Sequence, residues 1–187
     1  VIADKLVLPN IIKNRKEEVS AIDDVISQIS PECILKMPEE ARVEGGDVMP
    51  LNRCVFVGYS EKEDFKKYVA SRTNRAGLDF LVAAFPTKKI KGFELNKSDI
   101  DPRENALHLD CCFQPIGKNS AILYKGGFKN EVDVNFLESY FGAENIIEIS
   151  KEEMYNMNAN VFSISEQVIV SEKGFTRLNT ELRKRGF

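Results

Sequence analysis

The stretch ARVEGGDVMPLNRCVFVGYS, residues 41–60, decides the fold, because its layout returns twice further along the chain. A strand enters from alanine, a turn of glycine, proline and polar residues follows, and a β-rich strand, CVFVGY, completes the pair. The same order appears in ALHLDCCFQPIGKNSAILYKGGF (106–128) and in ANVFSISEQVIVSEKGF (159–175). Because self-similarity along a chain can fix a whole fold, the repeat is the basis of the fold prediction.

A helical pattern follows each strand pair, and the first of these stretches holds two helical pieces. Ser60 and Glu63 have the spacing of a capping box before that first stretch, and Gly142 and Gly186 are natural C-caps of the later ones. The first two helical stretches lead into further strands. The predicted helical stretches are 64–85, 132–142 and 176–186, and the strands that follow are 88–95 and 145–150.

The beginning of the chain fits the same scheme, with a strand at 2–10, a helix at 21–30 and a strand at 32–37. The repeated unit is therefore strand, turn, strand, helix, strand (ββαβ), and it occurs about three and a half times. Such units arranged in a circle form a propeller-like α/β barrel around a central channel. We expect residues 1–187 to form one such domain, incomplete at both ends; the alternative is that the echoes arise by chance in an ordinary α/β protein.

The composition excludes several classes of protein. The chain carries 26 basic and 29 acidic residues, interspersed and without a basic stripe, which argues against nucleic acid as a main partner. The longest apolar runs are far shorter than the roughly 20 residues that cross a bilayer. The opening VIADKLVLP is typical of a strand rather than of a signal peptide.

The four cysteines, at positions 33, 54, 111 and 112, form no CxxC pair. Adjacent Cys111 and Cys112 would point to opposite faces of a strand, where they are poorly placed to form a disulfide. Reduced thiols and a cytoplasmic location are therefore expected. The single histidine, His108, excludes a His-rich metal site and argues against a Cys/His zinc site.

Two motifs resemble a known family. VEGGDVM (43–49) and LHLD (107–110) are similar to the paired motifs of the guanidine-modifying superfamily, the penteins, which includes arginine deiminases, dimethylargininases, agmatine deiminases and glycine amidinotransferases. That superfamily has a five-fold ββαβ propeller, the architecture that the repeat suggests independently. GYS and SRTN, within 58–74, resemble the segment that follows EGGD, although the ten residues EKEDFKKYVA separate them here.

The resemblance implies a site for a guanidinium group, a planar cation that two carboxylates can bind in bidentate fashion. Carried over by motif, Glu44 and Asp110 would bind the guanidinium, and His108 would act first as general acid and then as general base. The ordinary alternatives are a structural histidine, a hairpin turn at EGGD and two solvated carboxylates.

Three further residues receive roles from the same resemblance. Asp47 would bind substrate or hold its loop, and Arg72 would meet a substrate carboxylate. Asn160, at the corresponding place in the third unit, would line the site. Gly45 and Gly46 would allow close approach of the backbone.

The nucleophile of the family is a cysteine near the C-terminus, which forms a covalent thiouronium intermediate. The resemblance places that cysteine beyond residue 187. Cys112 would share a strand face with His108 and Asp110 and is the only substitute nucleophile considered, whereas Cys33 and Cys54 are expected to be buried structural thiols on strands. HLD, rather than a motif with a basic third residue, favours deiminase-like or transferase-like members over dimethylargininase-like ones.

Three functions therefore stay open. The first is a guanidino-group hydrolase or amidinotransferase that acts on arginine, agmatine, a methylated arginine or a modified ornithine derivative. The second is a non-catalytic binding protein of this fold, like the ribosome-associated translation factor that shares it. The third is an unrelated α/β protein that binds a small cation at Glu44 and Asp110. The proposed chemistry needs no metal or organic cofactor, and a homodimer is the candidate for the oligomeric state.

Overall fold

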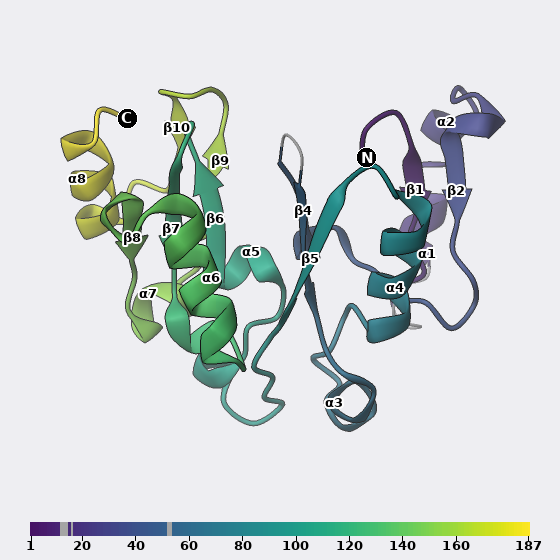
Figure 1. Ribbon diagram of the computed structural model, residues 1–187, viewed down its shortest axis with the longest axis horizontal. Coiled ribbons are helices and arrows are strands. Elements are labelled where there is room, and N and C mark those ends of the chain that lie inside the picture. Colours follow the sequence, from purple (N-terminus) through teal and green to yellow (C-terminus); the bar gives the residue numbers. More distant parts are fainter. Residues whose placement is uncertain (12–14, 16, 52–53) are drawn as a thin grey trace. The chain divides into compact units, whose positions relative to one another are not determined.

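The structure is a computed structural model that describes residues 1–11, 15, 17–51 and 54–187 (Figure 1). It is a mixed α/β protein with two compact units, Val1–Phe93 and Glu94–Phe187. Each unit contains one three-stranded sheet. The arrangement of all residues as a single propeller domain stays a prediction.

The first unit begins with a small parallel sheet. Strand β1 (Leu6–Leu8) pairs with β2 (Ile34–Lys36), and the short helices α1 (Glu17–Ser20) and α2 (Asp23–Ile26) lie between them in the chain. This confirms the predicted order of strand, helix and strand, although each element is shorter than predicted.

The larger sheet of the first unit has the order β3-β4-β5, with β3 (Val48–Pro50) antiparallel to β4 (Cys54–Tyr59). Between β4 and β5 (Lys89–Glu94) the chain forms α3 (Lys62–Lys67) and α4 (Arg75–Ala84), which confirms the two predicted helical pieces.

The predicted capping box at Ser60 and Glu63 is wrong. Helix α3 begins after Glu61 and has no side-chain cap, and Ser60 instead forms a β-bridge with Asn74. In the first unit, α4 is capped by a side chain, because Asn74 Oδ1 accepts a hydrogen bond from the Gly77 amide at 2.9 Å.

The core of the first unit forms where α4 packs on β4. Leu78 and Leu81, three residues apart, turn the same face of α4 inward. On the sheet, Phe56 and Phe93 meet edge to face with ring centroids 5.2 Å apart. The buried hydrophobic cluster between α4 and the sheet consists of Ile2, Val43, Val55, Val57, Leu78, Leu81 and Phe85.

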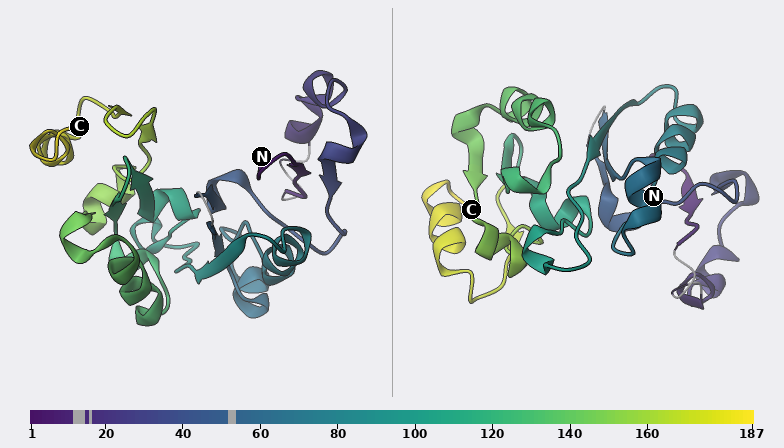
Figure 2. Two further views of the ribbon diagram at one scale, coloured as in Figure 1. Left: turned by 45° about the horizontal axis from the view of Figure 1, so that its top comes forward. Right: turned by 90° about the horizontal axis from the view of Figure 1, so that it is seen from below.

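The second unit repeats the ββαβ pattern (Figures 1 and 2). Strand β6 (Phe113–Ile116) pairs antiparallel with β7 (Ser120–Leu123), and β7 pairs parallel with β8 (Ile146–Glu148). Helix α6 (Glu131–Phe141) connects β7 to β8, and Phe141 packs against Phe113 of β6 at a centroid distance of 5.8 Å. Gly142, with φ of 83°, ends α6 as predicted.

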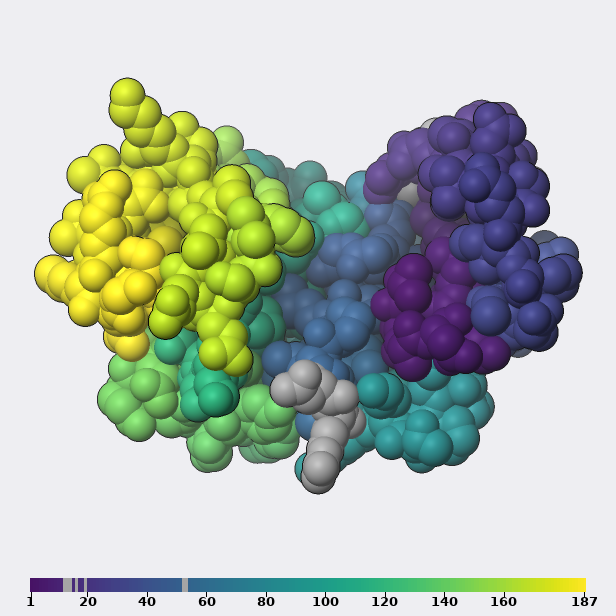
Figure 3. Space-filling model, turned by 90° about the horizontal axis from the view of Figure 1, so that it is seen from above, coloured from purple at the N-terminus to yellow at the C-terminus, as the bar shows by residue number. Residues whose placement is uncertain are grey.

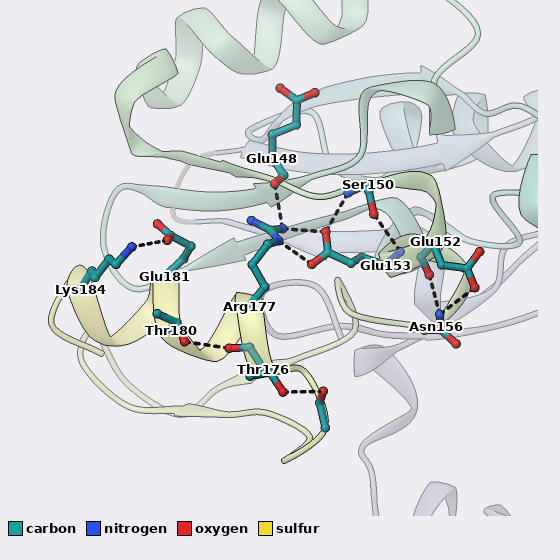
Figure 4. Close-up of polar contacts among 11 residues, drawn as sticks. Glu148, Ser150, Glu152, Glu153, Asn156, Thr176, Arg177, Thr180, Glu181 and Lys184 are labelled. Atoms are coloured by element: carbon teal, nitrogen blue, oxygen red, sulfur yellow. Dashed lines mark hydrogen bonds and ion pairs between the residues drawn. The ribbon is translucent and has the colours of Figure 1, made fainter.

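The chain then forms α7 (Lys151–Tyr155), strands β9 (Phe162–Ser163) and β10 (Ile169–Val170), and α8 (Thr176–Lys184). The sequence analysis did not predict α7, although Ser150 and Glu153 form a capping box at its start. Figure 4 shows how α8 is attached: the Arg177 guanidinium donates to both Glu153 carboxylate oxygens, at 2.6 and 2.7 Å, and to the Glu148 carbonyl at 3.1 Å.

Short 3₁₀ turns join several of these elements. They are Pro31–Cys33, Gly45–Asp47, Pro102–Glu104, Lys125–Gly127 and Ala143–Asn145.

The β9–β10 hairpin exposes apolar side chains at the surface, where it appears yellow-green in Figure 3. The four exposed residues are Phe162, Ile164, Val168 and Val170. None of the helices in the described part of the chain is both long and apolar enough to span a bilayer.

Candidate active site

Glu44 lies at the entrance to the 3₁₀ turn Gly45–Asp47, which leads into β3. EGGD is therefore not the turn of a hairpin, as its ordinary alternative required. Glu44 is only 4% exposed as a whole residue, and Asp47 is 1% exposed. Two carboxylates so deeply buried are costly unless cations or hydrogen-bond donors surround them. A β-carbon added at Gly45 would meet open space, so this glycine is not needed for close packing within the described chain.

The segment Ser71–Asn74 holds the Glu44 turn in place. The Thr73 hydroxyl accepts a hydrogen bond from the Glu44 amide at 3.1 Å. Asn74 forms two hydrogen bonds with the Arg42 backbone. The Asn74 side-chain oxygen accepts from the Arg42 backbone amide at 2.9 Å, and the Asn74 backbone amide donates to the Arg42 carbonyl at 3.1 Å. SRTN thus positions EGGD, a function that the sequence motif alone did not reveal.

Close packing of α4 strengthens this attachment. A β-carbon at Gly77 would lie 2.1 Å from the Arg42 carbonyl oxygen and 2.7 Å from a Val43 methyl group. Only glycine lets α4 approach the segment that leads to Glu44.

A guanidinium group contacts the Glu44 carboxylate. Arg15 Nη1 lies 2.6 Å from Glu44 Oε2, while Arg15 Nε and Nη2 bind the two oxygens of Glu18 at 2.8 and 2.7 Å. Hydrogen bonds to Glu18 and the charge of Glu44 raise the pKa of Arg15. Arg15 was not among the predicted site residues, since nothing in the sequence links it to a residue 29 positions away.

Arg72 carries a second guanidinium group in the first unit, and part of it is buried. Its Nε and Nη1 atoms are buried and find no hydrogen-bond acceptor among the described residues. Because a buried N–H group without an acceptor costs about 1–3 kcal/mol, the site fits an anionic ligand.

In the second unit, the prediction of a strand that enters from Ala106 is wrong for residues 109–112. His108 is extended, but Leu109–Cys112 form one helical turn, α5, before β6 begins. Within the turn, residues 109, 111 and 112 are buried. The turn brings Cys111, and not Cys112, beside the histidine and the aspartate: donor atoms of His108, Asp110 and Cys111 all lie within 4.8 Å of one another.

Asp110 is a partly buried carboxylate with several polar neighbours. Burial raises its pKa, while the charge of His108 and hydrogen bonds from Cys111 and Asn160 act in the opposite direction. The Cys111 thiol lies 3.6 Å from Asp110 Oδ1. Asn160 follows the turn after α7, in which Met157 has a φ of 64°. Asn160 lies close enough to Asp110 to lower the pKa of that carboxyl.

Lys97 binds the backbone that precedes His108, a contact that the sequence did not suggest. Its ammonium group donates to the carbonyls of Ala106 and Leu107 at 2.6 and 2.8 Å. The side chain is 9% exposed. It therefore fixes the backbone that leads directly to His108.

The remaining cysteines are poorly placed as nucleophiles. Cys112 is fully buried, and its thiol donates to the Leu109 carbonyl at 3.5 Å. Cys33 ends a 3₁₀ turn instead of lying on a strand, and both it and Cys54 are partly exposed, so the expectation of two buried thiols is wrong. Of the predicted site residues, Glu44, Asp47 and Arg72 belong to the first unit, and His108, Asp110 and Asn160 to the second.

Comparison with known proteins identifies the relatives. A family model described as N,N dimethylarginine dimethylhydrolase, eukaryotic, matches residues 3–185. The preference for deiminase-like or transferase-like members is therefore not confirmed. The chain is 28% identical over 148 residues to the uncharacterized protein YkgA of Bacillus subtilis (strain 168). This match covers 79% of the chain and 44% of YkgA.

Solved structures share the fold over the whole chain. The N-terminal domain of ArgZ, a cyanobacterial arginine dihydrolase crystallised as a cysteine-to-serine mutant with its substrate, superposes with a TM-score of 0.79 at 19% identity. A cysteine-to-serine mutant of the dimethylargininase DDAH from Pseudomonas aeruginosa, complexed with citrulline, gives 0.73 at 19% identity. Each comparison covers 100% of this chain and 63% of the other. The pentein fold is thus shown, and the unrelated α/β alternative is wrong.

Proposed function

The chain belongs to the N,N-dimethylarginine dimethylhydrolase family, and on that premise we propose that it forms part of a cysteine-dependent hydrolase of guanidino compounds. Glu44 and Asp110 bind the N–H edges of the guanidinium, and Arg72 binds a carboxylate of the substrate. His108 is the proton donor and acceptor. Asp47 holds the Glu44 turn, and Asn160 orients Asp110.

The proposed reaction has two steps. A cysteine thiolate from beyond residue 187 attacks the central guanidinium carbon, a C–S bond forms, and the C–N bond to the departing amine breaks as His108 protonates that amine. His108 then removes a proton from water, which attacks the thiouronium carbon. The C–S bond breaks, the hydroxyl proton of the adduct passes to solvent, and the ureido product and the thiolate are released.

The observation that carries the proposal is the ion pair at Glu44. The carboxylate of Glu44, a residue that is 4% exposed, already accepts a guanidinium N–H at 2.6 Å, which is the interaction that a guanidino substrate requires. Relatives with the same fold add support, because ArgZ and DDAH were crystallised as cysteine mutants with substrate and with citrulline.

Two alternatives differ in chemistry. In an amidinotransferase an acceptor amine, instead of water, would resolve the thiouronium. A non-catalytic binding protein would have no use for His108, so the retained set of Glu44, His108 and Asp110 favours an enzyme. A cytoplasmic location, a homodimer and a single propeller domain are parts of the same proposal.

Calorimetric titration of the full protein with L-arginine, agmatine and N-methylated arginines tests guanidinium binding. Glu44→Gln is expected to cost about 1.5–3 kcal/mol, the value of a charge-assisted hydrogen bond. Glu61→Gln is the matched control, because Glu61 also binds an arginine, Arg75, at 2.8 Å but lies near the surface. Equal affinities of the wild type and Glu44→Gln would refute the assignment of Glu44.

A further inference from the structure

Lys97 is a buried cation in the loop that joins β5 to α5 (Figure 1). Its ammonium donates hydrogen bonds to two successive backbone carbonyls, those of Ala106 at 2.6 Å and Leu107 at 2.8 Å. Removing an ammonium from water is costly, and replacing a buried ionic group by an apolar side chain of similar volume is often neutral for stability. A role beyond stability is therefore expected, and the location of the two carbonyls, just before His108, indicates which residue it serves.

The backbone that carries Lys97 is itself fixed. The side chain of the adjacent Asn96 donates to the carbonyls of Gly126 and Phe128 at 2.9 and 3.0 Å. The Asn96 backbone carbonyl accepts a hydrogen bond from the Ala106 amide at 3.0 Å. The Lys97 ammonium therefore holds the two carbonyls from a segment that has little freedom to move.

The paired carbonyls account for the bend of the chain at His108. In a regular strand successive carbonyls point to opposite sides, so one ammonium can bind both only where the chain departs from that geometry. His108 follows directly, and its carbonyl accepts a hydrogen bond from the Cys111 amide at 3.2 Å, at the start of α5. Hydrogen bonds thus hold the backbone on both sides of His108.

We propose that Lys97 is a positioning residue for proton transfer: its ammonium fixes residues 106 and 107 and thereby sets the direction of the His108 imidazole, without contacting the substrate. The proposal rests on the proposed function, in which His108 gives a proton to the departing amine and takes one from water. A displacement of about 1 Å at a reacting group can cost about a hundredfold in rate. Loss of the ammonium should therefore slow both proton transfers, whereas Glu44, in the first unit, still binds the guanidinium.

Steady-state hydrolysis of L-arginine, agmatine and N-methylated arginines by the full protein separates rate from affinity. Lys97→Met keeps the length of the side chain but removes its donors and its charge. It is expected to lower kcat about tenfold to a hundredfold and to leave KM within about twofold. Lys97→Arg restores a cation with several N–H donors and should recover part of kcat.

Lys5→Met is the matched control, because the Lys5 ammonium also donates to a backbone carbonyl, that of Glu32 at 3.0 Å, but in the first unit. It removes a bond of the same type and should keep the wild-type kcat.

A second measurement observes His108 without substrate. The imidazole Cε1–H signal that disappears from the NMR spectrum of His108→Ala belongs to this residue, and its chemical shift reports the surroundings of the ring. Lys97→Met is expected to move the signal, and Lys5→Met to leave it in place. Because no turnover is required, this measurement tests the positioning role separately from the proposed hydrolase function.

Wild-type kcat in a folded Lys97→Met variant, or a His108 signal that stays in place, would overturn the proposal. A parallel loss of kcat and guanidinium affinity that Lys97→Arg does not restore would also overturn it, because it would show a merely structural role. Circular dichroism establishes folding, and if Lys97→Met is unfolded, Lys97→Gln is judged by the same two measurements. Absence of turnover in the wild type would refute the hydrolase instead, and the His108 signal would still decide the role of Lys97.

Discussion

Arg15 places its guanidinium 2.6 Å from the Glu44 carboxylate, so the residue predicted to bind a guanidino substrate already binds a guanidinium of its own chain. The Arg15 side chain is 40% exposed, whereas that of Glu44 is 5% exposed. The cation thus reaches a buried anion from the solvent side, as a substrate would have to do.

Arg15→Gln is expected to tighten the binding of guanidino ligands, because the substrate no longer displaces an internal competitor. An ion pair with one solvent-exposed partner is weak, so the dissociation constant should fall by no more than about fivefold. Calorimetric titration with L-arginine measures the change.

Arg75→Gln is the control for Arg15→Gln, since Arg75 is 49% exposed and pairs with Glu61 and Asp79. It should leave the dissociation constant as in the wild type. Weaker binding in Arg15→Gln would mean that Arg15 helps to hold the ligand instead of competing with it.

Much of the fold was predictable from local pattern. Strands such as 88–95 and 145–150, and the helix that Gly142 ends, follow from periodicity and capping, which depend on neighbours in the sequence. The turn at 108–112 was not predictable in this way. The alternation in LHLDCC is typical of a strand, but the structure buries Leu109 and Cys112 together, and a separation of three residues requires a helical turn.

The same distinction applies to the site. EGGD and HLD were identifiable because each is a short contiguous motif. The contacts of Arg15 with Glu44 and of Lys97 with the carbonyl of Leu107 are set by tertiary structure and leave no local signal. The presence of Cys111 beside Asp110 depends on the same helical turn, which is why the sequence favoured Cys112.

Binding of a guanidinium should weaken at low pH, because Asp110 must be ionised to bind it. Burial raises the pKa of Asp110, so the loss of affinity is expected at a pH above the ordinary aspartate pKa of about 3.9. The hydrogen bond from Asn160 lowers the pKa of Asp110, and Asn160→Ala should therefore move the acid limb of the binding profile to higher pH.

Dissociation constants measured from neutral to acidic pH test this shift. Asn156→Ala serves as the control, since Asn156 donates to the Glu152 carbonyl at 2.7 Å and is not one of the groups that shift the pKa of Asp110. An acid limb at the same pH in Asn160→Ala and in the wild type would remove Asn160 from the site. Because the pKa of Asp110 is raised in the folded state, the free energy of unfolding should also decrease as the pH rises and Asp110 ionises.

Gly77→Ala is expected to lower the free energy of unfolding by at least about 1–3 kcal/mol, the usual cost of overpacking. The new methyl group would lie 2.1 Å from the Arg42 carbonyl oxygen, which is backbone and cannot rotate away. Urea denaturation measures the loss. Gly45→Ala is the comparison, because its methyl group would meet no atom within 4 Å, and equal stability losses in both variants would contradict the packing argument.

Arg177→Gln is expected to lower the free energy of unfolding by about 0.5–1 kcal/mol near neutral pH, a value limited by the 50% exposure of the Arg177 side chain. Arg177 lowers the pKa of Glu153 chiefly through its hydrogen bonds. The stabilisation is therefore present above the ordinary glutamate pKa of about 4.3 and is lost as the pH falls through the lowered value.

Thermal unfolding at several pH values follows this effect, and the difference between wild type and Arg177→Gln should disappear in acid. Lys184→Gln removes a more exposed pair, with Glu181, and should change stability less. A difference between wild type and Arg177→Gln that grows in acid would contradict the assignment to Glu153.

The most direct test of the central claim is turnover by the full protein. Purified wild type and His108→Ala are incubated with L-arginine, agmatine and N-methylated arginines, and ureido product is measured by mass spectrometry. We expect ureido product from the wild type with at least one of these compounds. We expect no detectable product from a His108→Ala variant that keeps its fold and its guanidinium affinity. Equal turnover by the two proteins, or no turnover by the wild type with any guanidino compound, would contradict the proposed hydrolase function.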